Sequence, residues 1–253
     1  MNAVRDEHFA GFGGAQLALH RLGAGRPVIL LHGLFSSADM NWIKFGHAQL
    51  IADAGFEALM PDLRAHGASA KPHDAANYPP DVLARDAEAL VAHLGVDDYD
   101  LVGFSLGART AVRSVLAGLR PRKLVLGGMG LEGLAGWNRR AAFFLDVIAR
   151  YGTIRPGDPA YMAQQFMKSM AIDRGAARLL LGTMQDTPPA ALAAITMPTL
   201  VLCGEQDDDN GYPDALAAAL PDATRATVPG THMGSVTQPE MGRELVSFLT
   251  GID

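Results

Sequence analysis

The chain has 253 residues, 49% of them hydrophobic, a formal net charge of −6 and a single cysteine. This length and composition suit one sizeable α/β domain, exclude an internal disulfide, and do not favour a nucleic-acid partner. There is no uncharged apolar run of about 18 residues and no signal-peptide core, so we expect a cytoplasmic protein with no membrane partner.

Short apolar runs alternate along the chain with helix-length stretches. The predicted strands are residues 27–31, 56–60, 99–104, 123–127, 199–204 and 224–228. Their uniformly apolar character suits a parallel sheet that is covered on both faces. The predicted helices between and after them are residues 41–54, 80–94, 105–118, 214–220 and 239–250. The repeated strand-then-helix pattern predicts an α/β fold with a mostly parallel, doubly wound sheet.

One segment interrupts this alternation. Between residues 131 and 197 the pattern predicts helices only, at 137–151, 159–170, 174–184 and 188–195. A helical insertion between two strands of a parallel sheet is typical of a cap over one end of the sheet. We therefore predict a core domain formed by residues 1–130 and 198–253, with a helical cap at residues 131–197.

The stretch GFSLG places Ser105 between Gly103 and Gly107, directly after a predicted strand. A serine on a sharp strand-to-helix turn has a strained backbone, and the residues two positions away must lack side chains because they crowd each other. This is the pattern of a nucleophile elbow. It predicts that the hydroxyl of Ser105 projects from the end of the sheet.

Two further candidates follow predicted strands, in the chain order Ser105, Asp207, His232. Sites in parallel sheets form at the carboxyl ends of strands, so these three side chains are candidates for a catalytic triad. Glu132, after the strand at 123–127, is an alternative acid. We expect the neighbouring Asp208 and Asp209 to point elsewhere and to cap the next helix.

With these residues in view, the sequence resembles the α/β-hydrolase superfamily. HGLF at 32–35 resembles the family's oxyanion strand end, and PDLRAHGAS at 61–69 resembles a second family block, departing at Ala65 where glycine is usual. GEQD and PGTHM resemble the acid turn and the histidine loop. The chain looks most like small bacterial carboxylesterases and enol-lactone or carbon–carbon bond hydrolases. Serine at the elbow speaks against dehalogenases and epoxide hydrolases, and Met233 against the carbon–carbon branch, where tryptophan is usual.

The chemistry assigns a role to each candidate. Ser105 is the nucleophile, His232 the base, and Asp207 the residue that orients the imidazole. The amides of Leu106 and Leu34 are the candidate oxyanion hole. In the same blocks, we expect His32 and His66 to have structural hydrogen-bonding roles rather than to bind a metal. Asp62 and Arg64 are expected to brace the loops beneath the triad.

The predicted cap carries an apolar set with helical spacing. Met162, Phe166 and Met170 recur every four residues and are predicted to share one face. Together with Phe35, Phe104 and Met233 they predict an apolar substrate pocket. The other large apolar residues of the segment are Phe143, Phe144, Tyr161, Met167 and Met184. The arginines of the segment form no cluster on that face, so we expect neutral esters to be preferred; those arginines are Arg139, Arg140, Arg150, Arg155, Arg174 and Arg178.

Two basic or glycine-rich features are interpreted as structural. The cluster Arg109, Arg113, Arg120, Arg122 and Lys123 is expected to be a solvated helix face and turn. Residues 128–133 match G-x-G-x-x-G, but no βαβ unit follows, so we expect flexible chain at the start of the cap and not a dinucleotide site.

Together these features predict a cofactor-free serine hydrolase that cleaves a small, mainly apolar carboxylic ester or lactone through an acyl-serine intermediate. Three alternatives stay open: a carbon–carbon bond hydrolase of a diketone acid, a perhydrolase, and a ligand receptor that keeps the fold but turns over slowly. The natural substrate and the oligomeric state do not follow from the sequence.

Overall fold

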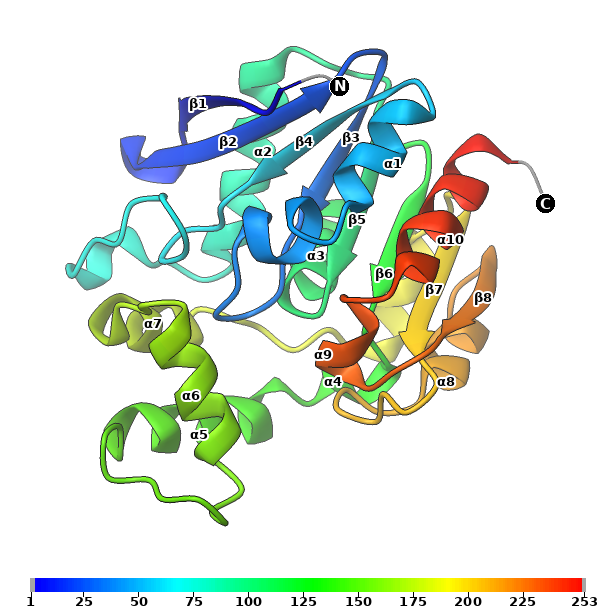
Figure 1. Cartoon of the computed structure of the whole chain (residues 1–253). Coiled ribbons are helices and arrows are strands. Elements are labelled where there is room, and N and C mark those ends of the chain that lie inside the picture. Colours follow the sequence, from blue (N-terminus) through cyan, green and yellow to red (C-terminus); the bar gives the residue numbers. More distant parts are fainter. Residues whose placement is uncertain (1–2, 252–253) are drawn as a thin grey trace.

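The computed structural model describes residues 3–251, and its strands form one eight-stranded sheet (Figure 1). The strand order is β1-β2-β4-β3-β5-β6-β7-β8. From β4 to β8 all neighbours are parallel, whereas β1 and β2 are antiparallel to their neighbours. The predicted α/β class with a mostly parallel sheet is therefore confirmed. The strands are β1 Arg5–Ala10, β2 Gln16–Gly23, β3 Arg26–Leu31, β4 Phe56–Pro61, β5 Asp100–Phe104, β6 Leu124–Gly127, β7 Thr199–Gly204 and β8 Ala223–Val228.

Helices cover both faces of this sheet. Alternate residues of each buried strand point to opposite faces: Ile29 and Leu31 pack into one hydrophobic cluster with α2, α3 and α8. Val28 and Leu30 pack into a second cluster with α1 and α10. Among the described residues the α-helices are α1 His47–Asp53, α2 Val82–Leu94, α3 Leu106–Ala117, α4 Leu131–Ala135, α5 Trp137–Ala149, α6 Tyr161–Ser169, α7 Arg174–Leu181, α8 Pro213–Ala219, α9 His232–Ser235 and α10 Pro239–Thr250.

The sequence pattern misses the first two strands. β1 is an edge strand in which only Phe9 is buried, and β2 carries three consecutive buried residues, 17–19, so neither has a clear period of two. Edge strands are commonly short and charged because this discourages further pairing. Here Arg21 of β2 pairs with Glu7 and Glu57 on either side.

The predicted helix at residues 41–54 is wrong. A short π-helix spans Asp39–Ile43, and α1 begins only at His47. Gly46 separates them in the left-handed region at φ 82°, which a glycine adopts without steric cost and which ends a helix. Asn41 lies in the π-helix before this break, and its Oδ1 accepts a hydrogen bond from Gly33 N in the loop after β3.

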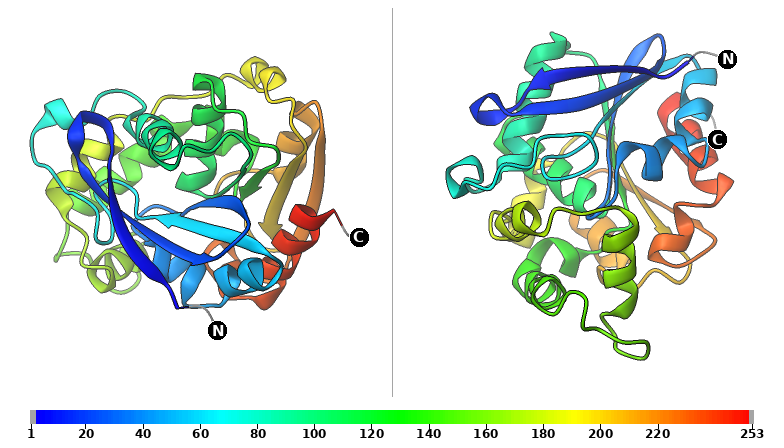
Figure 2. Two further views of the ribbon diagram at one scale, coloured as in Figure 1. Left: turned by 90° about the horizontal axis from the view of Figure 1, so that it is seen from above. Right: turned by 60° about the vertical axis from the view of Figure 1, so that its left-hand side comes forward.

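The segment between β6 and β7 contains no strand. It consists of α4, α5, α6, α7 and a 3₁₀ helix at Pro189–Ala194, where the sequence pattern predicts a fourth long helix. Figures 1 and 2 show α5, α6 and α7 gathered beyond one end of the sheet. Residues 128–133 are not flexible chain: Gly133 is buried, and a Cβ on Gly130 would lie 2.3 Å from the carbonyl oxygen of Gly211.

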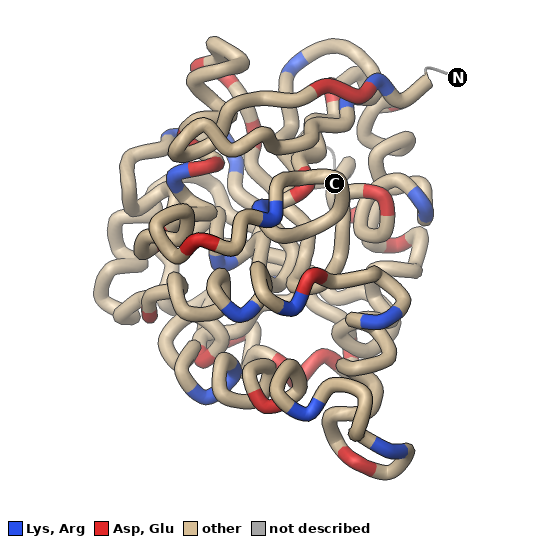
Figure 3. Tube along the Cα trace, turned by 90° about the vertical axis from the view of Figure 1, so that its left-hand side faces the viewer, with Lys and Arg blue, Asp and Glu red and all other residues tan. Residues whose placement is uncertain are grey.

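Along the chain trace in Figure 3, positions of Lys and Arg are interspersed with positions of Asp and Glu. Across residues 3–251, every helix is too short or too polar to traverse a lipid bilayer.

Candidate active site

Ser105 occupies a sharp turn between β5 and α3. Its φ of 52° and ψ of −109° are strained for a residue with a side chain. A Cβ on Gly103 would lie 2.3 Å from the backbone of Gly107, and a Cβ on Gly107 would lie 2.0 Å from the carbonyl oxygen of Leu31. Both glycines are therefore required by close backbone packing. The turn has the geometry that the GFSLG pattern predicts.

A chain of hydrogen bonds joins three of the predicted site residues. Ser105 Oγ lies 3.0 Å from His232 Nε2, and His232 Nδ1 lies 2.9 and 3.0 Å from the carboxylate oxygens of Asp207. The carboxylate accepts from the Nδ1–H, so Nε2 carries the lone pair that accepts from the serine hydroxyl. In this tautomer the imidazole can take a proton from Ser105.

The surroundings hold this imidazole in place. The Phe104 ring lies beneath His232 with 5.0 Å between ring centroids. A Cβ on Gly128 would lie 2.8 Å from the Phe104 ring and 2.9 Å from His232 Cε1, so this position admits no side chain. The Asp207 side chain is only 2% exposed, which protects its hydrogen bond from water. Packing thus allows the His232 ring little freedom to turn.

The alternative acids lie elsewhere. Glu132 accepts a hydrogen bond from the backbone N–H of Tyr212. Asp208 and Asp209 border a cavity next to the site. They do not cap α8, because that helix begins after Tyr212 with no side-chain cap. Of the four candidate acids, Asp207 is the one that contacts His232.

Leu34 follows β3, and Leu106 is the first residue of α3. The first backbone N–H groups of a helix have no carbonyl partner within it, so the Leu106 amide is available to a ligand beside Ser105. The neighbours of Leu34 are tied down: Gly33 N donates to Asn41 Oδ1, and Phe35 N donates to His66 Nε2. The loop that presents the Leu34 amide is therefore fixed on both sides.

His32 and His66 hold this loop against the loop after β4. His66 Nε2 accepts from Phe35 N, while His32 Nε2 accepts from Leu63 N across the same boundary. Each ring donates its Nδ1–H to a backbone carbonyl. Burial lowers the pKa of His32, and it lowers the pKa of His66 to about 3. Both rings stay neutral at pH 7, as acceptance at Nε2 requires.

Asp62 and Arg64 stabilise the same region. Asp62 accepts from the backbone N–H groups of Ala38 and Ala68. Arg64 is fully buried and pairs with Asp86 through two hydrogen bonds of 2.7 and 2.9 Å. Both contacts brace loops at the carboxyl ends of β3 and β4, as the sequence block suggests.

His20 on β2 is a supporting residue that the sequence gives no reason to single out. Its Nδ1 lies 2.7 Å from Asp6, and its Nε2 lies 3.4 Å from Asp62. The hydrogen bond to Asp62, aided by Asp6 and opposed by burial, raises the pKa of His20 to about 9. Burial acts to raise the pKa of Asp62, but the hydrogen bonds from His20 and the backbone outweigh it and lower that pKa.

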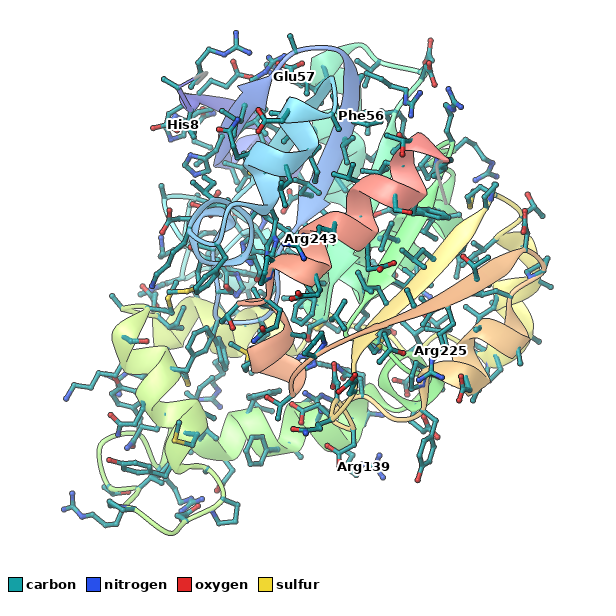
Figure 4. The ribbon with its side chains drawn as sticks, turned by 45° about the vertical axis from the view of Figure 1, so that its right-hand side comes forward. His8, Phe56, Glu57, Arg139, Arg225 and Arg243 are labelled. Carbon is teal, nitrogen blue, oxygen red and sulfur yellow. The ribbon has the colours of Figure 1, made fainter. Side chains whose placement is uncertain are left out.

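We expect His20→Gln to destabilise the protein by about 1 kcal/mol at pH 6, a value reduced by solvent screening on the Asp6 side. Because the folded pKa of His20 is raised from 6.5 to about 9, its contribution is complete below pH 6.5 and is lost as pH rises through about 9. Urea unfolding of the wild type and of His20→Gln between pH 6 and 10 measures the difference in their free energies of unfolding. His8→Gln is the control, since His8 lies exposed on β1 (Figure 4). If this difference in free energy of unfolding does not change with pH, the raised pKa of His20 is contradicted.

A cavity of about 790 Å³ opens beside Ser105 and His232, between the core and the α5–α6 region. Six of the apolar residues predicted for the pocket line it: Phe35, Phe143, Phe144, Met162, Phe166 and Met233. Phe104 instead borders a second cavity of about 250 Å³. Tyr161, Met167, Met170 and Met184 border neither cavity. Met170 is the residue that follows α6.

The expectation that arginines stay away from the pocket is wrong. Arg109, Arg139 and Arg140 all line the large cavity, and they are accompanied by Asp208 and Asp209. Arg139, labelled in Figure 4, lies in the first turn of α5. Arg140 donates to the carbonyl oxygen of Asp209. The cavity is therefore apolar in part and charged along one side.

Arg109 is also not on a solvated face. It is 3% exposed and donates to the carbonyl oxygens of Gly133, Leu134 and Gln185, at 2.5, 3.0 and 2.5 Å. Gly133 and Leu134 lie at the beginning of the segment between β6 and β7, and Gln185 follows its last α-helix, α7. Arg109 follows Ser105 by one helical turn, so a single guanidinium joins these two parts of the segment to α3.

We expect Arg109→Lys to lower the free energy of unfolding by about 3 kcal/mol, because an ammonium cannot reach all three buried carbonyls. Arg113→Lys on the same helix is the matched control. Arg113 pairs with Asp81 in a partly exposed bridge, and its loss should cost under about 1 kcal/mol. Urea unfolding monitored by circular dichroism compares the two variants. Equal losses would show that the buried carbonyls are not the cause.

Within residues 3–251, no group of three or more His, Cys, Asp or Glu side chains is placed to hold a metal ion. His32 and His66 lie with ring centroids 5.1 Å apart, but both rings use their nitrogens for backbone hydrogen bonds.

Comparisons with known proteins agree with the observed fold. A family model described as the alpha/beta hydrolase fold matches residues 26–127. A non-heme haloperoxidase of Rhodococcus erythropolis is 29% identical over 93% of this chain and 96% of its own. A hydrolase from Pseudomonas aeruginosa has a TM-score of 0.74 at 25% identity, covering 98% of this chain and 99% of that one. An esterase from Exiguobacterium antarcticum has a TM-score of 0.79, covering 97% and 100% of the two chains; at 18% identity it speaks for the fold alone.

Proposed function

Because the chain belongs to the α/β-hydrolase fold superfamily, we propose that it is a serine hydrolase that cleaves a small, mainly apolar carboxylic ester or lactone. The observation that carries the proposal is the hydrogen-bond chain from Ser105 through His232 to Asp207. A serine hydroxyl is a weak nucleophile at neutral pH, and a base within 3.0 Å makes it a competent one.

The reaction proceeds in two halves. Ser105 Oγ attacks the ester carbonyl carbon as His232 takes its proton, and the resulting oxyanion is stabilised by the amides of Leu34 and Leu106. His232 then donates the proton to the leaving oxygen, which departs and leaves an acyl-serine. Water, activated by the same imidazole, releases the acid. Asp207 stabilises the charged imidazolium in both halves.

We further propose that residues 131–197 are a cap that shapes the substrate pocket. Three observations support this: the segment is helical, it lies beyond the carboxyl ends of the strands, and its residues line the cavity next to Ser105. Phe143, Phe144, Met162 and Phe166 supply apolar surface, and Phe35, Phe104 and Met233 from the core complete the substrate-binding set.

Labelling with a fluorophosphonate tests the nucleophile, and turnover of p-nitrophenyl acetate then tests catalysis. We expect one equivalent of label on Ser105, followed by sustained multiple turnover in unlabelled enzyme. Labelling without turnover would favour the receptor alternative.

Each buried methylene of a longer acyl or alkyl chain should add up to about 0.8 kcal/mol of transition-state stabilisation until the pocket is full. A flat profile would contradict an apolar pocket.

Perhydrolysis is a second candidate, favoured by the similarity to a haloperoxidase over almost the whole chain. In this reaction hydrogen peroxide replaces water as the nucleophile that attacks the acyl-serine, and the product is a peracid. Competition between peroxide and water for the same acyl-enzyme measures the fraction of turnover that yields the peracid.

The cytoplasmic location stays a prediction.

A further inference from the structure

The loop after β3, which carries the Leu34 amide, is a tight turn. Ser36 N donates to the carbonyl oxygen of Gly33 at 3.2 Å, which closes a four-residue turn over residues 33–36. His32 Nδ1 donates to the same oxygen at 2.8 Å. Because the peptide bond is planar and trans, the Leu34 N–H points in the direction opposite to this carbonyl. Among the described residues no group accepts from that N–H, so it is available to a ligand.

Phe35 occupies an unfavourable position in this turn. It is the third of the four residues, and its φ is 59°. Turns with a positive φ at the third residue favour glycine, and a bulky side chain is uncommon in this region because its Cβ crowds the backbone. A residue held in this way persists only where its surroundings fix it. The backbone strain at Phe35 therefore calls for side-chain contacts that outweigh it.

Those contacts come from the helical segment at residues 131–197. Phe35 is buried in a hydrophobic cluster, called here the cap cluster, whose other buried members all belong to that segment: Val147, Ile154, Ala160, Met167 and Ala177. The Phe35 ring meets the Phe144 ring edge-on, with 5.4 Å between centroids. Leu34 packs against the cap cluster as well. The turn thus continues β3 through its backbone and packs into the helical segment through two side chains.

We infer that the proposed cap positions the oxyanion hole: the Phe35 ring, buried in the cap cluster, holds the turn at residues 33–36 in the conformation that aims the Leu34 N–H at the carbonyl oxygen of the substrate. The inference rests on the proposed function, in which this amide is one of two oxyanion donors. Hydrogen bonds to Asn41 and His66 fix the peptide groups before and after the Leu34 N–H. The cap cluster adds the contact that keeps Phe35 in its strained conformation. Phe35 is then a positioning residue that acts through the Leu34 amide.

Two substrates measure the oxyanion hydrogen bonds. p-Nitrophenyl acetate is compared with its thiono analogue, in which sulfur replaces the carbonyl oxygen and is a poor hydrogen-bond acceptor. The ratio of their kcat/KM values, ester over thiono ester, is divided by the ratio of their hydroxide hydrolysis rates. This corrected ratio reports how much the enzyme gains from hydrogen bonds to the carbonyl oxygen. A variant that displaces the Leu34 amide should lose turnover of the ester and keep most of its turnover of the thiono ester.

Val147→Ala is the main variant, because Val147 is fully buried in the cap cluster and borders neither cavity. We expect kcat/KM for the ester to fall about tenfold, mainly through kcat, because a misplaced oxyanion donor loses much of its effect. The corrected ratio should fall by the same factor. Ile154→Val, in the same cluster, should change both values in the same direction and stays measurable if Val147→Ala folds poorly.

Val115→Ala is the matched control. It removes the same atoms from a buried position near the carboxyl end of α3, in a different hydrophobic cluster. Its corrected ratio should equal that of the wild type, and circular dichroism and urea unfolding show how far each variant is destabilised. Equal falls for the ester and the thiono ester in Val147→Ala, or no fall for either, would overturn the inference.

Two variants at Phe35 test the link itself. Phe35→Ala keeps the restriction of a side chain at φ 59° but removes the ring, whereas Phe35→Leu keeps a large apolar side chain for the cap cluster. We expect the corrected ratio to fall more than tenfold in Phe35→Ala and to be largely restored in Phe35→Leu. Adding Val147→Ala to Phe35→Ala should not lower it further, because the ring that Val147 supports is gone. A further fall of about tenfold would show that Val147 acts by another route.

Ser105→Ala is measured alongside with both substrates. Turnover of the ester by that variant would mean that the proposed function has failed. Ser105-dependent turnover with corrected ratios that stay at the wild-type value in the Val147 and Phe35 variants would mean that only the link between the cap cluster and the oxyanion hole has failed.

Discussion

Replacing Ser105 with alanine is expected to lower kcat by about 10⁴-fold or more while leaving the fold intact. In the proposed mechanism the Ser105 hydroxyl forms the acyl-enzyme, and His232 Nε2, 3.0 Å away, is the base that takes its proton. His232→Ala should be about as damaging, and the double variant hardly worse than either single one, because the residues act as a unit.

Steady-state kinetics with p-nitrophenyl acetate measure these effects, and circular dichroism and urea unfolding show that each variant is folded. Ser105→Ala should be no less stable than the wild type, since serine and alanine have the same restriction at the φ of 52° found here. Near-normal turnover by the alanine variant would exclude Ser105 as the nucleophile. Strictly additive losses in the double variant would show that the two residues work independently.

Replacing Asp207 with asparagine is expected to lower kcat by about 10³- to 10⁴-fold. The asparagine amide can turn its N–H₂ toward His232 Nδ1 and stabilise the wrong tautomer, with the proton on Nε2 facing Ser105. Because the Asp207 side chain is 2% exposed, water cannot enter to stabilise the imidazolium in place of the lost carboxylate. The loss should appear mainly in kcat, because Asp207 stabilises the imidazolium of the transition state.

Matched changes at the other acids separate this role from a general effect of charge. Asp208→Asn, Asp209→Asn and Glu132→Gln each remove one negative charge from the same region, and each should change kcat by less than about tenfold. Glu132 contacts the Tyr212 amide and Asp208 borders the large cavity, so small effects on KM are expected from these variants. If Glu132→Gln is the variant that loses activity, the acid has been assigned to the wrong residue.

The features that the sequence predicts well are those that depend on neighbouring residues. GFSLG specifies its own turn, because Gly103 and Gly107 must approach backbone atoms within van der Waals distance. Asp207 and His232 are predicted because each lies within four residues of the end of a predicted strand, and parallel strands bring their carboxyl ends together. The placement of Asp207 and His232 at one edge of the sheet does not depend on the order of the strands.

The features that the sequence misses depend on distant partners. Arg109 looks like a surface residue in its helix, and only the carbonyls of residues 133, 134 and 185 reveal why it is buried. Asn41 lies in an apparently continuous helical pattern, and neither the break at Gly46 nor its hydrogen bond with Gly33 has a clear periodic signal. Likewise, the cavity-lining positions of Arg139 and Arg140 depend on how α5 sits over the core, which side-chain spacing within α5 does not specify.

The three hydrogen bonds of Arg109 also bear on how a substrate enters. A lid swings about its two ends, but here the chain before α5 and the chain after α7 both bind the Arg109 guanidinium of α3. Lifting the whole segment would leave the buried Arg109 guanidinium without these three carbonyl acceptors. We therefore expect the ends to move with the core as one rigid body. Access then depends on small displacements of α5 and α6 and on rotamer changes at the rim, where Met162 is 74% exposed. Such motions occur in nanoseconds to microseconds, faster than domain opening, so opening of the pocket should not limit turnover.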